Sequence, residues 1–153
     1  MMKRTVPRLW LCGILTASVL IFIWGNSMLP GKDSGELSGF VGAILQRILP
    51  FLNMESGTAM HLLRKAAHFS EFAALGLCLT WLYGMLATGK LCALSLPLIS
   101  GAAAAAIDET IQIFSPDRGP SIKDVALDTC GVFAGIAVLT LIQFLYRSKK
   151  SKR

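Results

Sequence analysis

Residues 66–86 read AAHFSEFAALGLCLTWLYGML, an apolar run interrupted by the ionisable pair His68 and Glu71. A helix rises about 1.5 Å per residue, so about 20 mostly apolar residues can cross the hydrocarbon core of a bilayer. Three further stretches meet the same condition, and these are roughly Leu9–Leu29, Leu91–Phe114 and Val125–Tyr146. The sequence therefore predicts an all-α fold, an integral membrane four-helix bundle.

The composition excludes a water-soluble domain. Of the 153 residues, 54% are hydrophobic and only 16% are charged, whereas soluble chains carry about 25% charged residues. So few polar side chains cannot cover so much apolar surface, and the apolar residues must therefore face lipid. Intrinsic disorder, a fibrous repeat and a disulfide scaffold are excluded as well. The cysteines lie inside apolar runs, where they are small packing residues, namely Cys12, Cys78, Cys92 and Cys130.

Basic residues set the predicted orientation. With an even number of spans both termini lie on one side, together with the turn between the second and third spans. The basic residues of that side have no acid among them: Lys3, Arg4, Arg8, Lys90, Arg147, Lys149, Lys150, Lys152 and Arg153. By the positive-inside rule this side is the cytoplasm. The net charge of +6 therefore reflects topology, and no nucleic-acid partner is predicted because no nucleic-acid motif accompanies it.

The first span shares one feature with a signal peptide, since basic residues precede its hydrophobic run. The residues that follow, Trp24-Gly25-Asn26-Ser27, lack a small-residue cleavage site. We therefore expect an uncleaved span. Residues 1–153 would then form one membrane domain of the cell membrane, with a basic cytoplasmic tail at 147–153.

The first outer loop, from about Pro30 to Lys65, contains a helix of another kind. Its apolar side chains recur at i, i+3, i+4 and i+7, and they are Leu37, Phe40, Val41, Ile44, Leu45, Ile48 and Leu49. This segment is too short to span a bilayer. We expect an amphipathic interfacial helix at about 36–49 that lies on the outer leaflet. A lid folded over the bundle is the alternative.

Ionisable residues also occur inside three spans, near their outer ends. There a charge costs about 2.5–3.5 kcal/mol on insertion scales, so it should face the bundle interior and find partners. Each span presents one group at helical spacing: Arg64, His68 and Glu71 on the second, Asp108, Glu109 and Gln112 on the third, and Asp124 and Asp128 on the fourth. We predict that these groups converge on one site. The alternative is a structural network in which they only pair with one another and Asp124 caps its helix.

The second outer loop, 115–124, is held in a fixed shape by two prolines and a glycine. It places Arg118 and Lys123 beside the carboxylates and next to a helix N-terminus, where a guanidinium and free backbone N–H groups favour phosphate or carboxylate. The predicted anion- and lipid-binding residues are Arg64, Lys65, Gln112, Arg118, Lys123, Asp124 and Asp128. The predicted acid–base residues are His68, Glu71, Asp108 and Glu109.

Two further points concern metals and oligomers. A divalent cation on the oxygens of the acid–base residues is an alternative, but the spacing matches no recognised metal motif, so neither a metal nor another cofactor is predicted. Gly131 and Gly135 form a Gly-xxx-Gly motif that allows close helix packing. The neighbouring helix is either in the same chain or in a second copy, which leaves a homo-oligomer open.

Three motifs resemble the VanZ-like family of small membrane proteins. They are Arg-Lys-Ala-Ala-His-Phe-Ser-Glu-Phe at 64–72, Asp-Glu-Thr-Ile-Gln at 108–112, and Arg118 followed by Asp124, Asp128 and Gly131. Asn26-Ser27, Ser34 and Ser38 are also similar to a serine-bearing segment of that family, whereas Phe72 stands where it often has tyrosine. The resemblance covers about residues 20–137. It implies a bacterial multi-pass membrane protein, from a family whose founding member is associated with low-level teicoplanin resistance, and it implies no particular reaction.

Two functions remain open at this point. In the first, a site open to the outer leaflet binds or processes an anionic amphiphile, such as a lipid-linked wall precursor or a lipoglycopeptide, among membrane lipids. In the second, the protein is a non-enzymatic envelope accessory or interaction partner, and its polar core is structural. Proton-coupled transport is disfavoured because the cytoplasmic halves of the spans lack ionisable residues for a relay.

Overall fold

The computed structural model describes residues 6–30, 47, 57–86, 89–116 and 118–151. These residues form the helices α1 (Val6–Met28), α3 (Gly57–Leu86), α4 (Lys90–Gln112) and α5 (Ile122–Ser151), and the described part of the chain contains no strand. Each helix is long and apolar enough to cross a membrane, with a mean hydropathy between 1.4 and 2.1 over its most apolar stretch. A helix pairs its own backbone groups, as a segment in lipid must. The predicted all-α bundle of four spanning helices is confirmed.

The limits of the helices differ from the predicted spans. Helix α3 begins at Gly57 rather than near Ala66, and α5 continues to Ser151 rather than ending near Tyr146. Hydropathy marks only the part of a helix that suits lipid, whereas Lys, Arg and similar residues continue a helix beyond that part. Arg64 and Lys65 therefore lie inside α3 and not in a loop. The interfacial helix expected at 36–49 lies outside the described residues, except for the helical residue Arg47.

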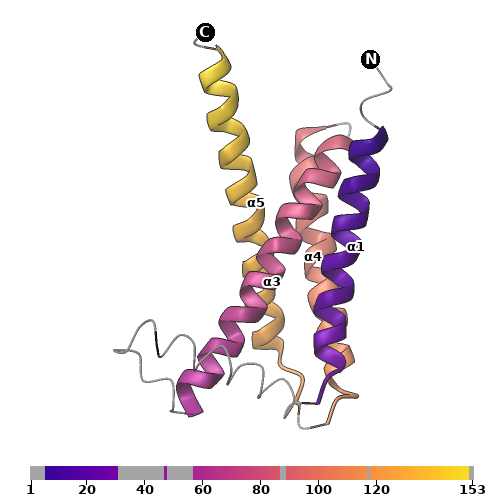
Figure 1. The fold of residues 1–153 in the computed structure, drawn as a ribbon, viewed down its shortest axis with the longest axis vertical. Helices are drawn as coiled ribbons and strands as arrows, with labels where there is room; N and C mark the ends of the chain where they lie inside the picture. Colours follow the sequence, from indigo (N-terminus) through magenta and orange to yellow (C-terminus); the bar gives the residue numbers. More distant parts are fainter. Residues whose placement is uncertain (1–5, 31–46, 48–56, 87–88, 117, 152–153) are drawn as a thin grey trace.

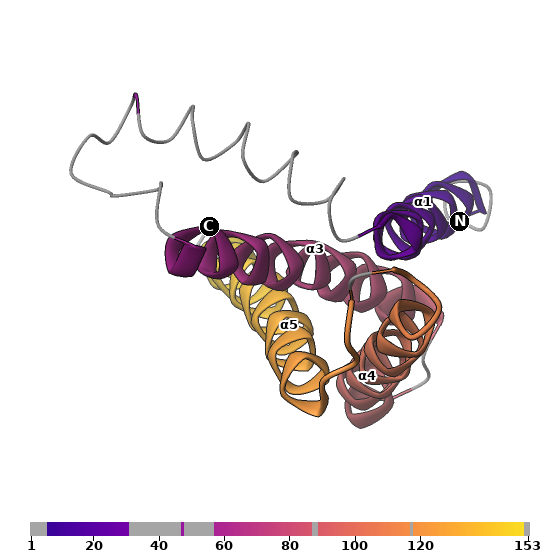
Figure 2. The ribbon, with the colours of Figure 1, turned by 90° about the horizontal axis from the view of Figure 1, so that it is seen from below.

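The helices alternate in direction along the bundle. The first turn of α1 and the last turn of α5 lie at the same end, at the top of Figure 1. Helix α3 packs against α1, α4 and α5, and it crosses α5 at an angle in both views (Figures 1 and 2). We call the end that carries residues 113–121 the loop end. The opposite end, where Gly89 lies between α3 and α4, is the turn end.

Glycines lie where the backbones of α3 and α5 come close together. A Cβ atom added to Gly131 would lie 2.5 Å from the carbonyl oxygen of Phe69, and one added to Gly135 would collide with the carbonyl oxygen of Ala73. Small residues allow two backbones to meet in this way. The neighbour of the Gly-xxx-Gly motif is therefore α3 of the same chain. An association of two copies would have to use another surface.

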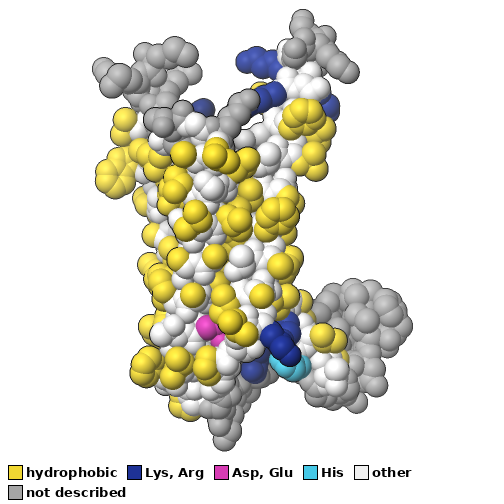
Figure 3. Space-filling model, turned by 180° about the vertical axis from the view of Figure 1, so that it is seen from behind, with side chains coloured by type: hydrophobic (Ala, Val, Ile, Leu, Met, Phe, Trp, Pro, Cys, Tyr) yellow, Lys and Arg dark blue, Asp and Glu magenta, His cyan; other side chains and the backbone are white. Residues whose placement is uncertain are grey.

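The core is small and the exterior is apolar. Phe72, Leu75 and Val132 are fully buried between the helices. Large hydrophobic side chains such as Trp10 and Phe144 are more than half exposed, and Figure 3 shows hydrophobic side chains over most of the length of one face. On that face Lys and Arg side chains lie near the two ends (Figure 3). This distribution fits a bundle whose middle is surrounded by lipid and whose two ends face water.

Candidate functional site

A buried carboxylate joins α1 to α4 at the loop end. The Asp108 side chain is fully buried. Its Oδ2 atom accepts hydrogen bonds from Ser27 Oγ and from Gln112 Nε2, both at 2.9 Å. Ser115 Oγ in turn donates to the backbone oxygen of Ser27 at 2.6 Å. These bonds fix the end of α1 against α4 and against the loop that follows α4.

Helix α1 makes a second contribution through Asn26. The Asn26 side chain donates to Glu71 Oε1 at 3.4 Å, and its backbone oxygen accepts a hydrogen bond from Arg118 Nη2 at 3.1 Å. The sequence predicts polar site groups on three spans and does not predict Asn26 or Ser27 as site residues. The available signal was the position of two adjacent polar residues at the end of an otherwise apolar span.

A pocket of about 370 Å³ opens at the loop end, and we call it the loop-end pocket. Most of the predicted site residues line it, and these are Arg64, Lys65, His68, Glu109, Gln112, Arg118, Asp124 and Asp128. His61, Gly119, Ser121 and Leu127 line it as well and were not predicted. His61 lies three residues before Arg64 and seven before His68, so the helical spacing would have revealed it had the start of α3 been placed correctly.

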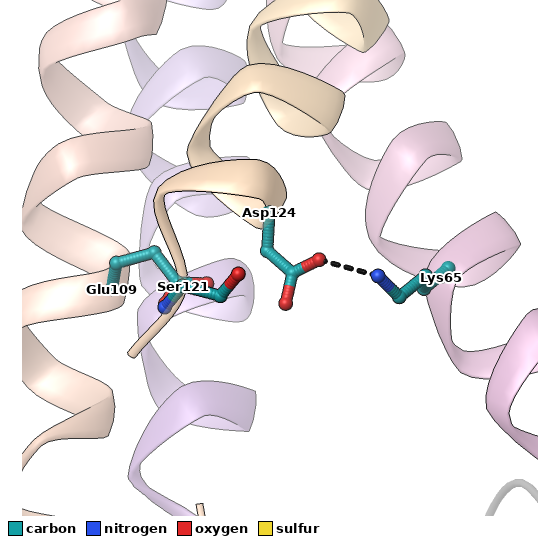
Figure 4. Close-up of polar contacts among 4 residues, drawn as sticks. All are labelled: Lys65, Glu109, Ser121 and Asp124. Atoms are coloured by element: carbon teal, nitrogen blue, oxygen red, sulfur yellow. Dashed lines mark hydrogen bonds and ion pairs between the residues drawn. The ribbon is translucent and has the colours of Figure 1, made fainter. Parts of the chain in front are cut away.

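Two contacts hold the rim of the loop-end pocket together. Lys65 Nζ forms an ion pair with Asp124 Oδ1 at 2.7 Å, and Figure 4 shows Asp124 between Lys65 and Glu109. Both side chains of this pair are about one-third exposed, so it contributes little to stability. The backbone N–H of Ser121 donates to Glu109 Oε2 at 2.7 Å. Glu109 therefore satisfies a backbone donor just before the start of α5, where no helical partner exists.

Three predicted residues do not line the loop-end pocket. Glu71 lies toward α1 through its bond to Asn26, and Asp108 is buried with Ser27 and Gln112. Lys123 is exposed to the surroundings. It is one position before Asp124 in α5, so it projects from a different face of the helix.

Five buried side-chain atoms near the pocket have no hydrogen-bond partner among the described residues. They are His68 Nδ1, Glu71 Oε2, Asp108 Oδ1, Arg118 Nε and Asp128 Oδ1. Three of these residues, His68, Asp108 and Asp128, can bring one side-chain ligand atom each to within 4.8 Å of one another. Buried polar atoms in proteins are nearly always paired, and exceptions call for an explanation such as a bound ion or a ligand. The cluster therefore has unused binding capacity.

Arg118 supplies a fixed positive charge at this site. It lies between the spanning helices, in the loop before α5. Burial, and then the positive charge of Arg64, lower the pKa of Arg118, whereas Asp108, Glu109 and Glu71 act in the opposite direction. An arginine nevertheless stays protonated in proteins. The loop-end pocket thus keeps a half-buried guanidinium cation.

The fold and the pocket define a multi-pass helical membrane protein with a polar site at one end of its bundle. The chain belongs to the VanZ/LLP1 family, whose model matches residues 12–143. This range includes every predicted site residue and part or all of each of the four helices, and it confirms the predicted VanZ-like membership. No curated protein matches the chain. No solved structure matches it.

Proposed function

We propose that the loop-end pocket binds or processes an anionic amphiphile. The head group would enter the pocket, and the tail would lie along the lipid-facing helices. The chemical class is a lipid-linked wall precursor or a lipoglycopeptide, which fits a family associated with teicoplanin resistance. Two of the four predicted acid–base residues, His68 and Glu109, line the pocket and would supply acid–base groups for any reaction at the head group.

The unpaired donor of Arg118 carries this proposal. Its guanidinium is held in place by the backbone oxygen of Asn26, yet the buried Nε atom has no partner among the described residues. A guanidinium fork binds phosphate or carboxylate through parallel hydrogen bonds. Arg64 and Lys65 line the same pocket. Its volume of about 370 Å³ lies within the range of small-ligand sites, about 300–1,000 Å³.

The surroundings of the loop end suit an amphiphile. Phe114 and Ile122 flank the loop before α5, and their side chains are 84% and 87% exposed. Apolar side chains at this level can contact the upper part of a lipid tail while the cations contact its head group. Such a division between an apolar and a charged contact is what an amphiphile requires.

A binding measurement tests the proposal directly. Purified protein in detergent would be titrated with a polyprenyl phosphate and, as a matched ligand, with the uncharged polyprenol. We expect the phosphate to bind at least tenfold more tightly, because hydrogen bonds to charged groups are worth about 1.5–3 kcal/mol. Arg118→Gln should remove this preference, whereas Lys123→Gln should retain it because Lys123 lies outside the pocket lining. Equal affinity for the two ligands, or an unchanged preference in Arg118→Gln, would contradict the proposal.

The proposal includes an orientation, with both termini in the cytoplasm and the loop end facing outward. The basic residues of the termini and of the turn end support it through the positive-inside rule. Lys123 is exposed at the loop end and so provides a reporter position. We expect Lys123→Cys to react with a membrane-impermeant thiol reagent added outside intact cells. Labelling only from the cytoplasmic side would refute the orientation and the outer-leaflet ligand with it.

A structural role is the second candidate, because Ser27, Asp108 and Gln112 form a network that joins α1 to α4. Cell phenotypes separate the two candidates. Glu109→Gln keeps an amide oxygen for the Ser121 N–H, and Arg118→Gln keeps hydrogen-bonding capacity. We expect both variants to reach the membrane at normal abundance and to lose tolerance to teicoplanin or to envelope stress. Wild-type tolerance in both would favour the structural role.

A further inference from the structure

We propose that His68, Asp108 and Asp128 bind one divalent cation of the transition series, with Zn²⁺ and Mn²⁺ as the best fits. The residues come from α3, α4 and α5, and each offers one ligand atom within 4.8 Å of the others. Ligand atoms bound to Zn²⁺ at about 2.0–2.2 Å are at most about 4.4 Å apart. Small side-chain rotations would therefore complete the coordination.

The burial of the two aspartates favours a cation between them. Asp108 is 0% exposed and Asp128 is 1% exposed, and the Oδ1 atom of each lacks a hydrogen-bond partner among the described residues. Two carboxylates at this separation repel each other and are costly to remove from water. A bound divalent ion offsets both costs, because it is the largest local charge and sits between them.

The contacts of Asp108 direct one of its oxygens toward the cluster. Ser27 and Gln112 both donate to Oδ2, which leaves Oδ1 without a partner. Metal-binding side chains are commonly held by such hydrogen bonds from neighbouring residues, which fix their orientation and tune their basicity. Ser27 and Gln112 therefore become positioning residues for the cation site.

The donor set selects the class of ion. His68 contributes an imidazole nitrogen with no partner at Nδ1, and the aspartates contribute oxygens. A site with one nitrogen and two oxygens suits Zn²⁺ or Mn²⁺, whereas Mg²⁺ and Ca²⁺ prefer oxygen ligands alone. Three protein ligands also leave at least one coordination position open, as in catalytic zinc sites. Because His68 and Asp128 line the loop-end pocket, this position would face the pocket and accept a water or an anionic oxygen.

A measurement of metal content tests this proposal without any lipid or drug. Its outcome is therefore separate from the outcome of the ligand-binding test of the anion site. Full-length protein in detergent would be freed of metal by a chelator and dialysed against micromolar Zn²⁺ or Mn²⁺, with millimolar Mg²⁺ present. Elemental mass spectrometry would then give the amount of each metal bound per chain. We expect one equivalent of Zn²⁺ or Mn²⁺ per chain. Less than a tenth of an equivalent of both ions, or displacement of both by Mg²⁺, would overturn the proposal.

A matched pair of variants locates the ion. Asp124 and Asp128 lie one turn apart on α5 and both line the pocket, but only Asp128 belongs to the ligand cluster. We expect Asp128→Asn to bind the ion at least tenfold more weakly and Asp124→Asn to bind it normally. Equal binding by the two variants would refute the site. If Asp128→Asn fails to fold, the visible spectrum of Co²⁺-loaded wild-type protein decides, since bands of tetrahedral or five-coordinate Co²⁺ support the site and an octahedral aqua spectrum refutes it.

Discussion

The two ends of the bundle differ in how their polar side chains are hydrogen-bonded. Toward the turn end, Thr80 Oγ1 donates to the backbone oxygen of Gly76 at 2.7 Å, and Tyr83 pairs with Ser100 at 2.9 Å. At the loop end the polar side chains reach across helices, and Asp108 and Asp128 keep buried oxygens without partners among the described residues. These turn-end side chains are thus paired, within one helix or between two, whereas the loop end keeps buried atoms that remain able to bind something else.

The size of a pocket does not distinguish the two ends. A pocket at the turn end has a volume of about 530 Å³, larger than the 370 Å³ of the loop-end pocket. Among the described residues that line it, Arg147 alone is charged, while the loop-end lining contains both cations and carboxylates. Convergent polar groups in a well-formed pocket mark a binding site better than volume alone. The mixed charges of its lining therefore favour the smaller, loop-end pocket as the proposed binding site.

The largest effect should come from the glycines on which both ends depend. In Gly135→Val the new side chain would meet the backbone of α3 at Ala73 and Leu77. Overpacking against side chains costs about 1–3 kcal/mol, and a collision with backbone should cost more. We expect the variant to misfold or to have a melting temperature far below that of the wild type in detergent. The structure of the loop end and that of the turn end should be lost together.

Gly84 provides the control for this change. An added Cβ atom there meets nothing within 4 Å. We expect Gly84→Ala to retain the wild-type melting temperature or to raise it slightly, since Ala is the better helix former. A folded Gly135→Val protein with normal stability would show that α3 and α5 do not cross as described, and the positions of His68 and Asp128 would then need revision.

The next effect concerns the buried carboxylate of the loop end. Asp108→Ala would remove the acceptor of Ser27 Oγ and of Gln112 Nε2, and Gln112 would keep only its longer bond to Ser27 Oγ at 3.4 Å. Unsatisfied buried groups cost about 1–3 kcal/mol, and we expect a loss of about 2 kcal/mol in the free energy of unfolding, measured by denaturant titration in detergent. Asp108→Asn keeps an oxygen for both donors and should lose less. Equal losses in the two variants would indicate that the negative charge, and not the hydrogen bonds, stabilises this end.

The sequence predicts the spans and the members of the polar site well, because each follows from local rules. Hydropathy locates four spans, and helical spacing groups His68 with Arg64 and Asp124 with Asp128. Helix ends are less predictable, since α3 extends beyond its apolar part to Gly57. The contribution of Ser27 was missed for another reason, which is that its bond to Asp108 joins residues far apart in the chain.

The ligand cluster could not be derived from spacing either. His68, Asp108 and Asp128 lie on three different helices, and their approach to within 4.8 Å depends on how those helices cross. Recognised metal motifs place ligands close together in the sequence. A crossing angle is set by glycine contacts such as that of Gly131 with Phe69, and no single span encodes both sides of such a contact.

A smaller effect is expected from the paired side chains near the turn end. Tyr83→Phe removes the hydrogen bond to Ser100, which joins α3 to α4. The net contribution of such a bond is about 0.5–1.5 kcal/mol, so we expect a loss of about 1 kcal/mol in the free energy of unfolding. Teicoplanin tolerance in cells should be unchanged at matched abundance. A loss of tolerance with normal stability would assign function to the turn end and contradict the conclusion that the loop end is the functional one.

The smallest effect should come from Thr80, although its side chain is as buried as that of Glu109, each being 5% exposed. The hydroxyl donates to the backbone oxygen of Gly76, which lies four residues earlier and already accepts the backbone N–H of Thr80 in the helix. Thr80→Val removes the donor together with its bond, keeps the branched shape and leaves no acceptor unpaired. Apolar replacements of this kind are close to neutral, so we expect the melting temperature in detergent to stay within about 2 °C of the wild type, which corresponds to no more than about 1 kcal/mol. A drop comparable to that of Asp108→Ala would show that a buried polar group bonded only within its own helix matters as much as the cross-helix network of the loop end, and the contrast between the two ends would then no longer favour the loop end as the functional one.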